Sequence, residues 1–227
     1  MTNKPFLIAL FLSVSVVAFA QSERTTDLGG IVSAEVSAGL GGKFGLSVEE
    51  ELRFKNSCTQ FDRWLNSVGV EYSCLHNRMN IGVTADYIRR YNDVGYYENR
   101  GRLGLQVTYT EEYRYFKFQG RSKLIGTFMD ESTGEHRVNP RLYWRNRLKV
   151  TYQHPNSRFK YSLYAELFWL TNDPKGSYID NLRTVFSVDY RLARQYSLSA
   201  FVRMDNDLQV KKPVDQFYLG LTFKAKY

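Results

Sequence analysis

The sequence predicts an all-β fold, a single antiparallel transmembrane β-barrel, and three observations support this prediction. Apolar and polar residues alternate with a period of two from residue 31 onward, the pattern of β-strands with two different faces. Most alternating segments run about 10–14 residues, whereas globular strands centre near ~5–6 and a tilted membrane strand needs ~9–11. Short and long connections follow one another in turn, as in bacterial membrane barrels.

About eleven segments carry this alternation. In the run "FKYSLYAELFWL", Phe159, Leu163 and Trp169 fall on one face, while Lys160 and Glu166 fall on the other. Single-chain bacterial barrels have even strand numbers. We therefore expect about 12 strands, with residues 22–30 supplying the missing one, and 10 strands as the alternative. The predicted strands cover residues 31–40, 44–54, 61–74, 79–91, 100–110, 114–126, 140–152, 158–170, 180–190, 195–205 and 215–227.

Residues 1–20 have the features of an export signal. Lys4 precedes the apolar run "FLIALFLSVSVVAFA", and Ala18 and Ala20 stand just before the polar Gln21. A basic start, a short apolar stretch and small residues before a polar one are typical of a cleaved secretory signal peptide. The run is shorter than the ~20 residues that a transmembrane helix needs. We therefore expect a mature barrel over residues 21–227.

The composition argues against several classes of protein. The formal net charge is +8, but an exported chain with no basic helix and no zinc-finger spacing is not expected to bind nucleic acid. Cys58 and Cys74 lie at opposite ends of one predicted strand, so we expect free thiols, since a disulfide needs Cα atoms within ~7 Å. The cysteines and histidines show no ligand spacing, and no metal or cofactor is expected.

An enzyme is not expected either. Nucleophilic hydrolysis needs a nucleophile and a base within hydrogen-bond reach. His76 and His154 fall in short turns and His136 falls in a long loop, so none lies on a predicted membrane strand beside a serine. His136 and its acidic neighbours fit a solvated loop better than a cation site.

Aromatic residues gather where the alternating segments end, which predicts two interfacial girdles. One set lies toward the short turns and the other toward the long loops. The first comprises Tyr72, Tyr109, Tyr152, Tyr190 and Tyr227, and the second comprises Trp64, Tyr143, Trp144, Phe168 and Trp169.

The chain stops inside its last predicted strand, "YLGLTFKAKY". Gly220, Phe223 and the terminal Tyr227 resemble the C-terminal signal that the barrel insertion machinery reads. Together with the export signal, this ending predicts the outer membrane of a Gram-negative bacterium as the location. The expected partners are outer-membrane lipids and, during biogenesis, the insertion machinery.

If the apolar face meets lipid, the opposite face lines the lumen. A lipid-facing Lys or Arg costs ~2–4 kcal/mol at mid-membrane, which fixes the phase of each strand. Glu50 falls on the apolar side, and we expect a bulge there. The acidic residues predicted to line the lumen are Glu35, Glu49, Glu51, Glu71 and Asp86, and the basic ones are Lys117, Arg121, Lys123, Arg145, Arg147, Lys149, Lys160, Arg183 and Arg203.

Two interpretations of these charged walls remain open. Walls separated by water would form a narrow porin-like channel that prefers small anions. Walls in contact would form an ion-pair network that fills the lumen. Basic residues outnumber acidic ones, which favours the channel. The alternative function is a non-conducting structural or accessory subunit of an outer-membrane complex, with Tyr-rich loops such as "DVGYYENRG" contacting a partner.

Three runs of sequence suggest a family. "VSAGLGGKFGLSVEEELRF", "IGVTADYIRRY" and "RLYWRNRLKVTY" resemble the outer-membrane barrel family called domain of unknown function 2490. The likeness covers most of the mature chain and rests on alternating patterns. It implies a barrel fold and an outer-membrane location, and it supplies no catalytic residues.

Overall fold

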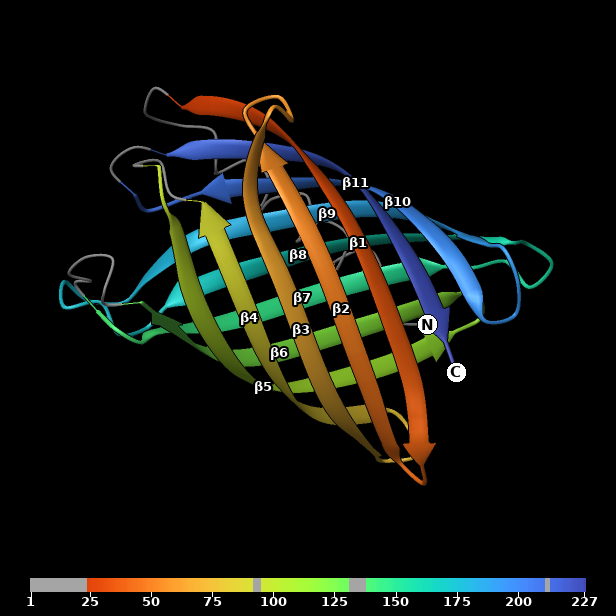
Figure 1. Ribbon diagram of the computed structural model, residues 1–227. Coiled ribbons are helices and arrows are strands. Elements are labelled where there is room, and N and C mark those ends of the chain that lie inside the picture. Colours follow the sequence, from red (N-terminus) through yellow and green to blue (C-terminus); the bar gives the residue numbers. More distant parts are fainter. Residues whose placement is uncertain (1–23, 92–94, 131–137, 211–212) are drawn as a thin grey trace, which may run out of the picture.

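A computed structural model describes residues 24–91, 95–130, 138–210 and 213–227. The predicted signal peptide at residues 1–20 and His136 lie outside these residues. The described residues form eleven strands and no helix, and the strands close into one barrel (Figure 1). The strands are β1 (Thr25–Gly41), β2 (Phe44–Lys55), β3 (Gln60–Cys74), β4 (Met79–Tyr91), β5 (Tyr97–Tyr113), β6 (Phe116–Met129), β7 (Arg141–Tyr152), β8 (Phe159–Leu170), β9 (Tyr178–Arg191), β10 (Tyr196–Asp207) and β11 (Val214–Lys226).

The predicted all-β barrel is confirmed, and the strand number lies between the two that were expected. Successive strands pair antiparallel, and β1 closes the barrel against β11 in parallel. Thr25 pairs with Val214, and Ser37 pairs with Lys226. Residues 25–30 extend β1 and do not form a strand of their own. Gly29 and Gly30 have no side chains to alternate, so the sequence pattern begins only at residue 31.

The connections lie at two rims. One rim holds the turns that follow odd-numbered strands and the end of β11; the other holds the remaining connections and the start of β1 (Figure 1). We call them the short-turn rim and the long-loop rim. The β2–β3 connection differs from the prediction, because it spans only Asn56–Thr59 and turns through positive φ at Asn56, Ser57 and Cys58. The alternation of connection lengths is therefore incomplete.

The outer face of the barrel is apolar and the inner face is polar. Val32, Leu105 and Leu219 are more than half exposed, while their polar neighbours along the strands are buried or half-buried. Water-soluble proteins arrange their faces the other way round. An apolar band around a closed barrel is the arrangement of barrels that face lipid. Over the described residues, no helix is long and apolar enough to cross a membrane.

Two details of the outer face differ from the predictions. Glu50 lies on the outer face within a regular stretch of β2, and its carboxylate accepts a hydrogen bond from Trp64 Nε1 (2.9 Å). The bulge lies nearby at Asp62, where the pairing of β2 with β3 shifts. In the predicted girdle near the long loops, the rings of Trp144 and Trp169 stack at 5.6 Å. Tyr143 and Phe168 do not join them. Tyr143 lies on the inner face with Arg145 and donates a hydrogen bond to Asp180 (3.1 Å), and the Phe168 ring lies against two guanidinium groups inside the barrel.

Candidate functional site: the charged interior

All the predicted lumen residues alternate with the apolar outer positions and lie on the inner face. Their side chains form three regions: an ion-pair cluster toward the long-loop rim, an acidic sector on β1–β4, and a basic sector on β6–β8. The residues placed on this face are Glu35, Glu49, Glu51, Glu71, Asp86, Lys117, Arg121, Lys123, Arg145, Arg147, Lys149, Lys160, Arg183 and Arg203.

The ion-pair cluster is built around Tyr218, which is 1% exposed. The guanidinium groups of Arg53 and Arg203 lie 5.2 and 5.3 Å from the centroid of its ring. Arg203 also forms an ion pair with Asp205. The same carboxylate forms a second ion pair with Arg183, whose Nε lies 2.8 Å from Oδ1. Arg53 pairs with Glu51, so each charge of the cluster has a partner. Because the Tyr218 ring and both guanidinium groups are buried, the cluster fills interior space toward the long-loop rim.

Glu166 joins two arginines in the basic sector. Its carboxylate is 1% exposed and lies 2.5 Å from Arg121 Nη2 and 2.8 Å from Arg145 Nη2. The guanidinium carbon of Arg145 lies 4.1 Å from the centroid of the Phe168 ring, and that of Arg183 lies 4.7 Å from it. One carboxylate therefore holds two cations, and one positive charge is left over.

The acidic sector is only partly paired. Asp86 accepts a hydrogen bond from Ser67 (2.7 Å) and lies 3.5 Å from Arg102. Glu35 and Glu49 are direct register partners on β1 and β2, and neither has a basic partner within 4 Å among the described residues. Their facing carboxylates carry like charges, which destabilises a cross-strand pair unless solvent or a counter-ion separates them.

Three cations of the basic sector have no carboxylate partner among the described residues: Lys123, Arg147 and Lys149. Lys123 is only 8% exposed, and its Cε atom lies 2.6 Å from where a Cβ on Gly104 would sit, so a glycine on β5 makes room for it. Arg147 lies over the ring of Tyr164, with its guanidinium carbon 5.3 Å from the centroid.

The remaining basic residues are paired. Lys160 and Lys224 share Asp189, at 3.5 and 2.7 Å. Lys117 pairs with Glu112 at 3.1 Å, where both side chains are largely exposed at the short-turn rim. Lys117 therefore lies at the mouth of the barrel and away from the basic sector.

Ion pairs within the described residues join charges on the same strand or on strands no more than two apart. None links an acid of β1–β4 to a base of β6–β8. The two walls are thus not tied together by direct ion pairs in this part of the chain, and the excess of positive charge on β6–β8 faces the interior.

Several inner residues were not predicted. Arg53 and Arg102 stand in the same strand phase as predicted lumen residues, so the alternation alone could have identified them. Lys224 and Tyr218 alternate with the apolar residues of the last strand in the same way, which places both on the inner face. The alternation does not show that the Tyr218 ring packs between two guanidinium groups.

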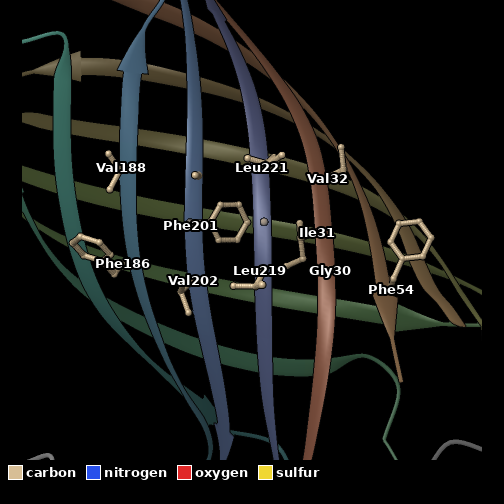
Figure 2. Close-up of a pocket in the computed structure, with 12 residues that line it drawn as sticks. Gly30, Ile31, Val32, Phe54, Phe186, Val188, Phe201, Val202, Leu219 and Leu221 are labelled. Carbon is tan, nitrogen blue, oxygen red and sulfur yellow. The ribbon is translucent and has the colours of Figure 1, made fainter. Parts of the chain in front are cut away.

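The C-terminal residues have structural contacts of their own. A Cβ on Gly220 would overlap the ring of Phe201, which Figure 2 shows between β10 and β11. The Phe223 ring packs on Tyr196 with centroids 5.8 Å apart, and the Tyr227 hydroxyl lies 3.1 Å from that of Tyr196.

An apolar groove of about 510 Å³ lies on the outer face, where β1, β9, β10 and β11 run side by side (Figure 2). Its lining includes Val32, Phe186, Val202, Leu219 and Leu221.

The cysteines and histidines of the described residues form no site. Cys58 lies in the β2–β3 turn and Cys74 at the other end of β3, and both are free thiols. His76 and His154 lie in turns at the short-turn rim. No group of three metal-ligating side chains comes together within the described residues.

Comparison with known proteins gives a family and a fold. A family model described as "Protein of unknown function (DUF2490)" matches residues 31–215. No curated protein matches the chain. Among solved structures, that of the NanC porin superimposes with a TM-score of 0.50 at 16% sequence identity, covering 83% of this chain and 90% of that one. At this identity the likeness establishes the porin-like barrel fold.

Proposed function

Because the chain belongs to the DUF2490 family, whose description names no activity, we propose a function from its interior: an outer-membrane β-barrel that forms a narrow porin-like channel for small anions. The observation that carries this proposal is the basic sector. Arg147, Lys149 and Lys123 face the interior without a carboxylate partner among the described residues. Rings of Arg and Lys are the means by which pores favour anions.

The outer-membrane location rests on two features. The apolar outer face needs lipid around it, and the first 20 residues have the features of a signal peptide. The porin-like fold supports the same location. The ion-pair cluster at Tyr218 supports a narrow channel, because it fills part of the cross-section.

The experiment is single-channel recording of the refolded chain from residue 21, in a planar bilayer with a KCl gradient. We expect discrete conductance steps and a reversal potential that reports anion preference. Arg147→Gln with Lys149→Gln should move the reversal potential toward cations. Arg78→Gln is the matched control, since Arg78 is 60% exposed in a turn at the rim and pairs with Glu111.

A silent bilayer containing inserted barrel would contradict the channel. Insertion is checked by resistance of the strands to added protease. In that case the accessory-subunit hypothesis would take its place, and copurification of a stoichiometric partner would be its test.

A further inference from the structure

Four cations face the interior between β7 and β11, and two of them lie at the carboxylate of Asp189. Arg147 and Lys149 come from β7, Lys160 from β8 and Lys224 from β11. We call these four residues the cation group. Lys149 is the direct register partner of Tyr164, whose ring lies against the Arg147 guanidinium group, and Lys160 lies on the same face of β8 as Tyr164. Asp189 pairs with Lys160 and Lys224 but with neither Arg147 nor Lys149, and Glu35 is the register partner of Lys224. The charges of Arg147 and Lys149 therefore have no ion-pair partner among the described residues.

Within the described part of the chain, Arg147 has a free hydrogen-bond donor and a guanidinium group held against a ring. Its Nε is buried and has no hydrogen-bond partner among the described residues. The Tyr164 ring lies against its guanidinium group and restricts the orientation of this planar fork of N–H donors. Its direct register partners are Arg121 and Glu166, and Glu166 is already occupied by Arg121 and Arg145. The protein therefore supplies donors here and no acceptor.

We propose that the cation group, with Tyr164, is a binding site for polyvalent oxoanions, with phosphate as the simplest example. This proposal rests on the proposed channel and names the class of solute that it favours. An anion of charge −2 or more neutralises several members of the cation group at once, whereas a monovalent anion leaves most of their repulsion in place. The Arg147 fork matches the geometry of two oxygens of a phosphate, and the lysines add point charges.

The test adds inorganic phosphate to single channels that conduct chloride, at pH 7.5, where phosphate is mainly divalent. We expect phosphate to reduce the chloride current in a saturable way, because it occupies the same path and leaves it more slowly. Acetate, which is monovalent, should reduce the current far less at equal concentration. In the Arg147→Gln, Lys149→Gln variant, half-reduction of the current should need at least about tenfold more phosphate, whereas Arg78→Gln should behave as wild type.

The outcomes separate this inference from the proposed function. Chloride current that phosphate and acetate affect equally would overturn the oxoanion site and leave the anion channel standing. If the inserted barrel carries no current, the channel is overturned, and calorimetric titration of the detergent-solubilised barrel with phosphate decides the site. Heat release that the double variant abolishes would support it, and its absence in wild type would overturn it.

Folding of the variants is checked independently. Removing two uncompensated cations relieves repulsion, so the double variant should fold as well as wild type. Lys149→Gln alone serves as a second variant, with a smaller shift in phosphate sensitivity expected. A shift as large in Arg78→Gln as in Lys149→Gln would overturn the assignment to the cation group.

Discussion

Individual glycines decide where aromatic side chains can lie in this barrel. A Cβ on Gly29 would come 2.5 Å from the Tyr218 ring and would also overlap the main-chain oxygen of Phe54, which cannot move away. Gly29→Ala should therefore lower the free energy of unfolding by ~1–3 kcal/mol. Gly101→Ala is the control, because nothing lies within 4 Å of the added Cβ there. Urea unfolding followed by tryptophan fluorescence measures both; equal effects would contradict this account of Tyr218.

A second residue-scale prediction concerns Glu50, an acidic side chain on the apolar outer face between Val48 and Leu52. Replacing both members of its hydrogen bond, by Glu50→Leu with Trp64→Phe, should raise the free energy of unfolding in lipid by about 1–2 kcal/mol, because a lipid-facing charge is costly. Replacing both partners leaves no donor unsatisfied. A loss of stability in the double variant, measured by urea unfolding in vesicles, would mean that this position does not face lipid.

At the scale of elements, Glu166 of β8 connects three strands through Arg121 on β6 and Arg145 on β7. Glu166→Gln leaves two buried cations without their carboxylate, which should cost about 3–5 kcal/mol of unfolding free energy. It should also strengthen the anion preference, because the basic sector gains net positive charge. Glu112→Gln at the rim, where the pair with Lys117 is exposed, should cost no more than about 1 kcal/mol. The free energy of unfolding and the reversal potential of Glu166→Gln are measured together. An unchanged free energy of unfolding would contradict the proposal that Glu166 joins the three strands.

The closing strand pair gives another prediction. Ala34 and Phe223 are direct partners in the parallel pairing of β1 with β11, and both lie on the outer face. Cysteines at these two positions should form a disulfide on mild oxidation in a chain with Cys58→Ser and Cys74→Ser, because aligned neighbours lie within the ~7 Å that a disulfide allows. Cysteines at Val32 and Phe223 are offset by one pair along the same face and should link much less. Equal linking of both pairs would contradict this register.

How far the elements could be predicted depends on whether their side chains alternate. β4 runs over residues 79–91, as predicted, because Ile81, Val83 and Ala85 alternate with polar or small residues. The start of β1 was missed because Gly29 and Gly30 present no side chain. Phe168 was assigned to the outer girdle because composition at a strand end does not tell which face a ring occupies. The ion pairs between strands could not be predicted, since they depend on the register, whereas same-strand pairs such as Arg203 with Asp205 follow from the alternation alone.

For the molecule as a whole, an odd number of strands over the described residues places the two ends of the barrel at opposite rims. β1 begins at Thr25 on the long-loop rim, and β11 ends at Lys226 on the short-turn rim (Figure 1). In bacterial barrels the longer loops face outward and the short turns face the periplasm. Thr25 should therefore lie at the cell surface, on the same side as the β8–β9 loop.

Single cysteines test this topology in intact cells that export the protein, in the chain without Cys58 and Cys74. Thr25→Cys and Lys175→Cys, both at exposed positions, should react with a thiol reagent that does not cross membranes. Asn156→Cys, in the exposed β7–β8 turn, should react only after the outer membrane is permeabilised. If Thr25→Cys instead reacts together with Asn156→Cys, both ends share one side and an even number of strands closes the barrel. The parallel pairing of β1 with β11 would then be wrong, and the cysteine pair at Ala34 and Phe223 should also fail to link.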